Sequence, residues 1–490
     1  MTPMLAGLLK TAARDPKLTG LVANLGAPRL HLTGVDQARP WAIGTLAHHA
    51  PVLVVTATGR EAEDLTAELR AMLGDKVAWF PSWETLPHER LSPGVDTVGQ
   101  RARVLDLLAD GRVKVVVTAA RGFCQPLLPE VEGRAPIRLR EGAEYDFTSL
   151  VEELVFRAYS HVDMVARRGE FATRGGILDI FPTTADQPVR IEFWGDEITE
   201  IRQFSVADQR TIPEVEVAGV DVYTARELPI TDAIAARARE LSTTHPGNAT
   251  LVELLSKIAD RIPADGMEAL IPALVDKQMV ALPDLMPEGT HIVLVGPEKI
   301  RTRISDLEAT DAEFLAAGWE AAAMGADGPI AVEGLDLESS SYRSYEALQA
   351  GTDLPWWTMD MLHGDDAQTL PLDFEPAPAP RGDIKQITEM MALLRAHTTS
   401  GGRAAFIAPA PGAIKRMTER FAEAGVPSRV ATPGWEPSPG EITLYQALSH
   451  AGLVFRDVVV VTETDLTGNR VGDIAGAKRR PARRRHRVDP

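Results

Sequence analysis

Apolar and polar residues alternate in four short runs within residues 159–210, and turn-forming residues separate the runs. The runs read EFAT, GILDIF, VRIEFW and EITEIRQF, with breaks at 174–176 (RGG), 182–188 and 195–196 (GD). A period of two, bounded by glycine, proline and aspartate, predicts an antiparallel meander with one buried face and one polar face.

The polar face of this meander is expected to carry Arg174, Arg190 and Trp194. Arginine and aromatic side chains dominate protein–protein contacts, so the face is a candidate docking surface. A solvated sheet face with Trp194 in the core explains the same pattern, and the residues alone leave both interpretations open. None of the three is an obvious catalytic group.

Upstream of the meander, apolar strands alternate with helices. The pattern predicts a helix over 1–26, then a strand at 29–33, a strand at 51–56, a helix at 61–73, a strand at 77–80, a helix at 97–108 and a strand at 113–119. Such strands alternating with helices indicate a parallel sheet that is covered on both faces. This wrapping is typical of a nucleotide-binding α/β domain.

The pattern changes near residue 136 and changes back after residue 223. A strand at 137–140, a helix at 148–157 and the meander predict a small α+β domain that is inserted into the first domain. The return into the first domain is predicted from helices at 232–242, 249–262 and 305–317, a strand at 291–296, and Trp356-Trp357 as a core or interdomain contact.

A proline-rich segment, DFEPAPAP at 373–380, marks a linker before a third unit. That unit is predicted from helices at 383–398 and 411–424 and strands at 403–409, 428–432, 441–446 and 457–464. The predicted fold is therefore α/β and multidomain. A parallel-sheet domain is expected in two halves, 1–133 and 224–371, with an α+β domain inserted at 134–223. A linker at 372–382, a separate C-terminal α/β domain at 383–468 and a basic tail at 469–490 are expected to follow.

Composition narrows the class of protein. A chain of 490 residues is too long for one core and is expected to hold three or four domains. No apolar run is long enough for a transmembrane helix, and the N-terminus has no signal-peptide pattern. The single cysteine, Cys124, excludes an intramolecular disulfide and fits a reducing cytoplasm. It is expected to be a packing residue, since no Cys-His pair is evident.

The loop after the first strand occupies the place of a phosphate-binding loop. That loop needs G-x-x-x-x-G-K-[ST], whose amides, lysine and hydroxyl hold phosphate and Mg²⁺. In register from Gly34, Arg39 stands at the second glycine, Pro40 at the lysine and Trp41 at the hydroxyl position. Proline also lacks an amide donor. We therefore expect a degenerate site that binds no ATP.

Other catalytic chemistry finds no support in the sequence. The motifs HExxH, CxxC, GxSxG, GKT and GKS are all absent from the chain, and no DExx box follows a strand. His88 and the pair His48-His49 are expected to be solvated or structural residues rather than acid–base or metal-binding groups. We predict no catalytic residue and no metal site.

Charge is distributed unevenly along the chain. The formal net charge is −18, but residues 470–490 carry eight Lys or Arg against two Asp, which leaves about −24 for the remainder. An acidic body of this kind argues against a broad nucleic-acid-binding surface. The tail is expected to be a solvated linker, and weak binding to DNA phosphates is the alternative.

Three further blocks make the chain resemble a known family. They are WETLPHERLSPGVDTVGQRARVLDLL (83–108), VTAARGFCQPLLP (117–129) and VVVVTETDLTGNRVGDIAGAKRRPARRRHR (458–487). With the meander, they resemble the N-terminal, UvrB-like region of bacterial transcription-repair coupling factors (Mfd). The resemblance covers essentially the whole chain and is weakest between about 230 and 370.

The resemblance implies a non-catalytic module. In this family the inserted domain contacts the damage-recognition ATPase UvrA, and the contact positions fall on Arg174, Arg190 and Trp194, where relatives can carry Phe in place of Trp. The domain that binds RNA polymerase and the ATP- and Mg-dependent DNA translocase follow in the family and are not in this sequence. The resemblance also implies that the UvrA-binding surface is masked by the C-terminal part of the resting full-length protein.

We therefore expect a cytoplasmic module that recruits UvrA and couples the removal of stalled transcription to nucleotide excision repair, with no cofactor of its own and no membrane contact. Two alternatives stay open. One is a DNA-binding scaffold that acts through the Arg-rich tail, and the other is an atypical nucleotide-dependent enzyme.

Overall fold

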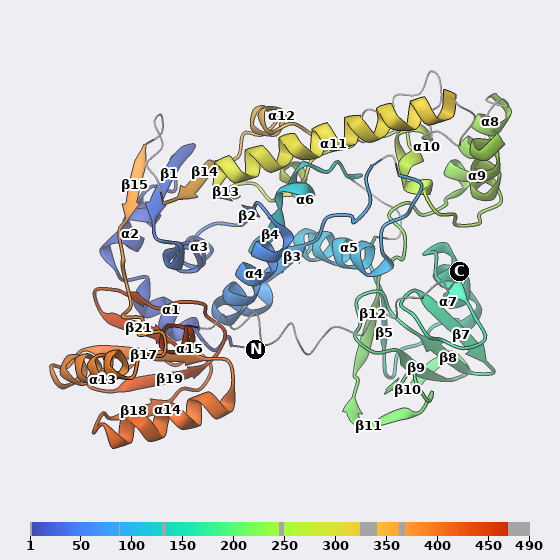
Figure 1. Cartoon of the computed structure of the whole chain (residues 1–490). Coiled ribbons are helices and arrows are strands. Elements are labelled where there is room, and N and C mark those ends of the chain that lie inside the picture. The colour runs from blue at the N-terminus through green and yellow to red at the C-terminus, as the bar shows by residue number, and fades with distance from the viewer. Residues whose placement is uncertain are drawn as a thin grey trace, which may run out of the picture.

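The computed structural model describes the chain in three units, which Figure 1 shows as a parallel sheet with helices and two smaller units at its opposite ends. Coordinates are described for residues 2–87, 89–129, 134–244, 249–323, 341–361 and 368–468. The predicted α/β multidomain fold is confirmed.

The first unit is built on a seven-stranded sheet in the order β15-β1-β14-β13-β2-β4-β3, and all neighbouring strands are parallel. Its strands are β1 (Arg29–Gly34), β2 (Val52–Thr56), β3 (Val77–Phe80), β4 (Val115–Ala119), β13 (His291–Val295), β14 (Trp356–Asp360) and β15 (Thr369–Leu372). Strands β1–β4 precede the meander in sequence and β13–β15 follow it. The sheet is therefore complete only when the chain returns from the insert.

Helices cover both faces of this sheet. One face packs on α1 (Ala6–Ala12), α2 (Pro16–Ala23), α3 (Arg39–Leu46) and α4 (Gly59–Leu73), and the other on α5 (Val95–Ala109), α6 (Ala120–Cys124), α11 (Pro297–Ala323) and α12 (Tyr345–Ala350). Within β2, Val52 and Val54 belong to the first core, whereas Leu53 and Val55 belong to the second. Strands that are buried on both faces explain the nearly continuous apolar runs in the sequence.

The single helix predicted over residues 1–26 is wrong. The chain forms α1 and α2, which are separated at Asp15 and Pro16. Asp15 adopts an extended conformation, and its side chain accepts a hydrogen bond of 3.0 Å from the Lys17 amide. Proline is favoured at the first turn of a helix but breaks a helix interior, so the chain restarts at this point.

The return into the first domain departs most from the prediction in a helix and a strand. The helix predicted at 305–317 is 27 residues long, because it begins at Pro297 directly after β13 and ends at Ala323. Trp356 and Trp357 lie in β14, near the middle of the sheet, and are 5% and 0% exposed. The expectation that this pair is in the core is confirmed, but the strand itself was not predicted.

The inserted unit contains a six-stranded sheet in the order β11-β10-β9-β8-β7-β6. Its strands are β6 (Ser160–His161), β7 (Glu170–Arg174), β8 (Ile177–Ile180), β9 (Val189–Trp194), β10 (Glu197–Phe204) and β11 (Thr211–Glu216). Pairing is antiparallel from β7 to β11, which confirms the meander, and β6 adds a parallel edge. One face packs on α7 (Phe147–Phe156) and on the pair β5 (Ile137–Arg140) and β12 (Gly219–Val222).

A small helical group follows the insert. It contains α8 (Asp232–Thr244), α9 (Ala249–Ala259) and α10 (Ile271–Leu274), which share one apolar cluster with Trp83 and Leu128 of the first unit.

The C-terminal unit is a separate mixed sheet in the order β16-β20-β21-β17-β19-β18. Its strands are β16 (Glu375–Pro376), β17 (Arg403–Ala408), β18 (Ser428–Val430), β19 (Ile442–Gln446), β20 (Leu453–Val454) and β21 (Val458–Thr462), and its helices are α13 (Ile384–Thr399), α14 (Pro411–Glu423) and α15 (Glu463–Thr467). The proline-rich segment contributes the edge strand β16. The unit is fixed to the first one, because Tyr445 and Phe455 share the apolar cluster that contains α1–α4.

Candidate protein-docking surface

The outer face of the inserted sheet carries all three residues that the sequence indicated. In β9, Val189, Ile191 and Phe193 are buried, so Arg190 and Trp194 point to the opposite side of the strand. On β7, the exposed Arg174 stands opposite Ile177, which in turn stands opposite Glu192 of β9. Because directly paired residues share a face, Arg174, Arg190 and Trp194 lie on one surface.

Trp194 is the most exposed large apolar side chain among the described residues, at 82%. It ends β9 and stands opposite Glu197, across a tight turn in which Gly195 has a φ of 63°. Glycine adopts this conformation without strain. The interpretation of Trp194 as a core residue is therefore wrong. An exposed indole on a rigid strand has the form of an interface anchor.

Arg190 is held by the protein itself. Its Nε and Nη2 donate hydrogen bonds of 2.7 and 2.8 Å to the two carboxylate oxygens of Asp179, which is almost fully buried. The guanidinium also lies 5.1 Å from the ring centroid of Phe204. Hydrogen bonding to Asp179 raises the pKa of Arg190 further above its ordinary value. The side chain is thus fixed in orientation while about a quarter of it stays exposed.

Arg174 is exposed at the end of β7. Its Nη2 donates a hydrogen bond of 2.7 Å to the backbone oxygen of Asp163, in the segment before β7. This contact orients the guanidinium without neutralising its charge. Arg174 can therefore offer charge-assisted hydrogen bonds to a carboxylate of a partner.

Sequence reasoning missed Asp179 and Glu192, which complete the surface. Asp179 stands directly opposite Arg190, and Glu192 lies in the row between Arg190 and Trp194. In each strand, the alternation of side chains places these residues on the polar face. The meander pairs β8 with β9, but the register of this pair was not readable from the sequence, because a long connection at 181–188 separates the strands.

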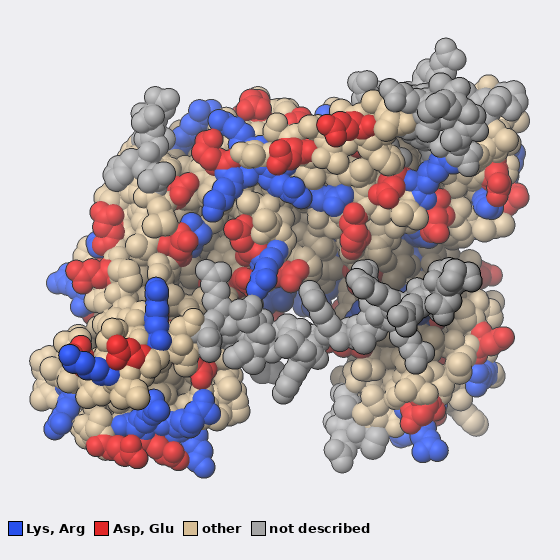
Figure 2. Space-filling model, viewed as in Figure 1, with Lys and Arg blue, Asp and Glu red and all other residues tan. Residues whose placement is uncertain are grey.

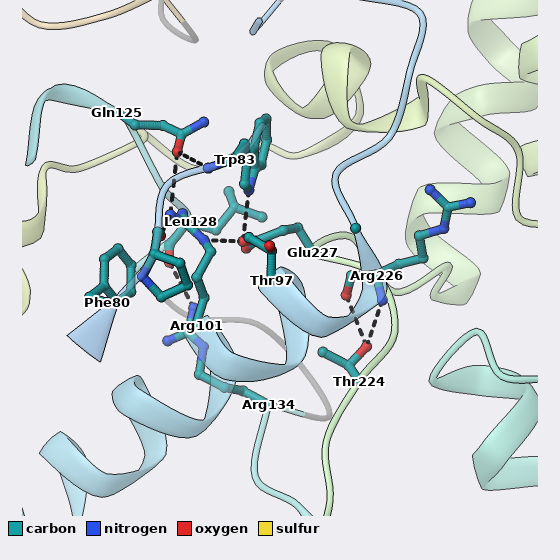
Figure 3. Close-up of polar contacts among 12 residues, drawn as sticks. Phe80, Trp83, Thr97, Arg101, Gln125, Leu128, Arg134, Thr224, Arg226 and Glu227 are labelled. Atoms are coloured by element: carbon teal, nitrogen blue, oxygen red, sulfur yellow. Dashed lines mark hydrogen bonds and ion pairs between the residues drawn. The ribbon is translucent and has the colours of Figure 1, made fainter. Parts of the chain in front are cut away.

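A buried polar cluster attaches the insert to the first unit, and Figure 3 shows it between α5 and the segment that leaves the insert. Arg101 of α5 is 1% exposed and forms an ion pair with Glu227. The Nε1 of Trp83 donates 2.9 Å to the same carboxylate, and the guanidinium lies 4.5 Å from the ring centroid of Phe80. Removing Glu227 would leave the Arg101 guanidinium buried without a counter-charge.

The degenerate loop residues lie under the third unit. Gly34 approaches β15 so closely that a Cβ atom would stand 2.6 Å from the Leu372 oxygen. Arg39 pairs with Asp36 at 2.5 Å, and Pro40 lies in the first turn of α3. Trp41 is fully buried, with its ring 5.1 Å from that of Phe455. Trp41 stands where a working loop has its Mg²⁺-binding hydroxyl, and here it makes an apolar contact between the first and third units.

A cleft of about 640 Å³ lies beside this loop, where the ends of β2 and β13 face the third unit. Its walls mix both charge signs, as in Asp36, Arg39, Glu68, Arg381 and Asp465. Figure 2 shows acidic and basic side chains similarly interspersed over the described residues on the face it draws. That this loop does not bind ATP stays a prediction.

The other candidate groups have structural surroundings. Cys124 is buried in the first unit, and burial raises the pKa of its thiol to about 12. His48 contacts the Gly44 oxygen at 2.9 Å. Within the described ranges there is neither a group of metal-ligating side chains nor a helix long and apolar enough to cross a membrane. His88 and the tail at 469–490 lie outside the described residues.

Known proteins match this chain in sequence. A family model described as the UvrB interaction domain matches residues 137–228, which contain the meander and its candidate docking face. The transcription-repair-coupling factor of Mycobacterium tuberculosis (strain CDC 1551 / Oshkosh) is 45% identical over 511 residues, which cover 100% of this chain and 41% of the relative. The factor of Escherichia coli (strain K12) is 27% identical over 89% of this chain and 37% of its own length.

The parallel-sheet unit with its inserted sheet therefore defines a protein that contains a UvrB interaction domain. The chain is homologous over its whole length to transcription-repair-coupling factors. It spans about two fifths of the length of these curated relatives.

Proposed function

We propose that this chain is a non-catalytic recruitment module that binds UvrA through the outer face of its inserted sheet. The observation that carries the proposal is the exposed Trp194 beside Arg174 and a fixed Arg190, within a UvrB interaction domain. In a longer coupling factor, such binding would bring the damage-recognition machinery to the place where a stalled RNA polymerase is removed.

The geometry supports binding rather than chemistry. The surface lies on paired strands, and Arg190 is already held by two hydrogen bonds to Asp179, so a partner orders few groups when it binds. An aromatic anchor flanked by arginines is the usual composition of an interface hot spot. RNA polymerase binding, ATP hydrolysis and DNA translocation are proposed to reside in other parts of the longer protein, and the whole protein is expected in the cytoplasm.

A second, regulatory role is proposed for the same face. When it docks on the C-terminal part of the resting full-length protein, UvrA is excluded and the motor is restrained. UvrA or stalled polymerase would then shift the equilibrium by binding one state better than the other. Trp194 supports this role, because an indole exposed to 82% gains apolar burial from either partner.

The test is a titration of this chain with purified UvrA, by calorimetry or surface binding. The decisive variant is Arg174→Ala together with Trp194→Ala, because both side chains are exposed and their loss is expected to leave the fold intact. Loss of affinity by tenfold or more, about 1.4 kcal/mol, with an unchanged melting temperature is expected.

The matched control changes an exposed arginine and an exposed tryptophan of the third unit, Arg429→Ala with Trp435→Ala. This variant should bind UvrA as the parent does. Equal binding by both variants would move the contact away from the meander, and no binding by the parent would remove support for UvrA recruitment.

A further inference from the structure

The docking face carries negative as well as positive charge. Each row of side chains across the strands can be read from the pairing register, which places Asp179, Arg190 and Arg202 in one row and Arg174, Ile177, Glu192 and Glu200 in the next. Trp194 and Glu197 form a third row at the edge. The face is therefore mixed in charge, not basic.

Most of these charges are neutralised within the sheet. Asp179 is paired with Arg190, and Glu200 with Arg202. Glu192 and Glu197 are exposed, and neither has an ion-pair partner among the described residues. Among the described residues, the one polar contact of the Arg174 guanidinium is with the backbone oxygen of Asp163.

Glu192 is also placed at a cost to the folded state. It stands directly opposite Glu200 across the β9–β10 pair, and like charges in that position are destabilising. Residues that break a local rule of stability without a compensating internal contact are the ones expected to serve function. Within the described residues, Arg190 attracts Glu192 but forms no ion pair with it, so a basic side chain of a partner would supply the missing contact.

We propose that Glu192 and Glu197 receive basic side chains of the docking partner while Arg174 receives an acidic one, so that the surface selects a partner patch of mixed charge around a site for Trp194. This inference rests on the proposed recruitment function and adds the chemistry of the partner surface. Because β7 and β9 are two strand spacings apart, the acidic and basic groups of the partner should lie about 10 Å from one another.

The experiment measures the association rate and affinity for UvrA at low and high salt, with the parent, with Glu192→Gln plus Glu197→Gln, and with Glu192→Lys. The neutral variant is expected to associate about three- to tenfold more slowly at low salt, with a weaker salt dependence, because charges at an interface rim act mainly on association. Glu192→Lys should lose about tenfold or more in affinity.

The melting temperature is expected to change in the opposite direction from the affinity for UvrA. Removing the charge of Glu192 relieves its repulsion with Glu200, so both variants should melt at or above the temperature of the parent. A slower association together with a stable fold cannot come from partial unfolding. The control is Glu419→Gln with Glu423→Gln on the exposed face of α14, which should leave both readouts unchanged.

Equal or tighter binding by the Glu192 and Glu197 variants, with the parent binding UvrA, would overturn this inference and leave the recruitment function intact. Failure of the parent itself to bind UvrA would overturn both.

Discussion

The carboxylate of Asp179 and the guanidinium of Arg190 face each other across β8 and β9 and share two hydrogen bonds of 2.7 and 2.8 Å. Asp179 is almost fully buried, so Arg190 is its counter-charge as well as part of the candidate docking face. Arg190 therefore contributes to the folded structure and to the surface at once, and a single alanine substitution mixes the two effects.

Arg190→Ala is expected to destabilise the chain by about 2–4 kcal/mol, because it leaves the Asp179 carboxylate buried without a partner. Asp179→Ala should cost a similar amount. The double variant should cost at least about 1 kcal/mol less than the sum, as in any pair that interacts directly. Urea unfolding of the four proteins measures this. Additive costs would mean that the contact between Asp179 and Arg190 contributes nothing to stability. The control is Arg174→Ala, which changes an exposed side chain and should alter the free energy of unfolding by less than about 0.5 kcal/mol.

The contact of Trp41 with Phe455 predicts that the degenerate loop holds the third unit rather than a nucleotide. Trp41→Ala should cost about 3–5 kcal/mol, since a large buried side chain leaves a cavity between two units. Trp41→Phe keeps most of the packing and should cost much less. Differential scanning calorimetry compares the variants, and similar melting temperatures for the parent and Trp41→Ala would contradict the prediction.

The same loop predicts how the chain responds to MgATP. A ligand present at a hundred times its dissociation constant stabilises a protein by about 2.7 kcal/mol. We expect no shift in melting temperature with millimolar MgATP, because Pro40 and Trp41 occupy the lysine and hydroxyl positions. A control NTPase with an intact loop should shift under the same conditions. A saturable shift of this chain would restore the alternative of an atypical nucleotide-dependent protein.

The sequence predicted those parts of the fold that depend on local pattern. The buried strands around Val54 and Val117 were readable because both of their faces are apolar. The parity of β9 likewise placed Arg190 and Trp194 on one side. Trp356 was harder, because the short strand WWTMD of β14 carries a threonine and an aspartate and lacks a two-residue period.

What the sequence left out depends on contacts between distant segments. Asp179 meets Arg190 only through the register of β8 and β9, and Trp41 meets Phe455 only through the docking of the third unit. Such pairs cannot be predicted from how far apart two residues lie in the sequence or from their residue types. The proposed contact of Glu192 with a basic partner could not be predicted from the sequence for the same reason. It depends on the position of Glu192 opposite Glu200, which is set by the register of β9 and β10.

Cys124 gives a test of the closed packing in the first unit. Burial raises the pKa of its thiol to about 12, so at pH 8 the reactive thiolate should be about 10³-fold rarer than in the unfolded chain. Labelling with iodoacetamide should be at least about 10²-fold slower in the native protein than in guanidinium chloride. Complete reaction of the single thiol in denaturant is the control. Rapid labelling of the native protein would show that this core opens readily.

Glu68 predicts how pH acts on the contact between the first and third units. It is buried on α4 and its Oε1 accepts a hydrogen bond of 2.5 Å from the backbone amide of His450. Burial raises the pKa of Glu68, although attraction to His450 opposes that effect and repulsion from Asp64 adds to it. Because the folded pKa lies above the unfolded one, the stability associated with the protonated carboxyl is present at low pH. It is lost as pH rises from the unfolded pKa through the folded pKa.

Glu68→Gln keeps an oxygen acceptor for the His450 amide and is neutral at every pH, so it removes this loss. The variant should match the parent in acid and exceed its free energy of unfolding by a margin that grows as the pH rises toward 8 and levels off above the folded pKa. Urea unfolding at a series of pH values between 4 and 8 measures the difference, and Glu419→Gln on α14 serves as an exposed control. A difference that does not grow with pH would show that Glu68 is as well solvated in the folded chain as in the unfolded one.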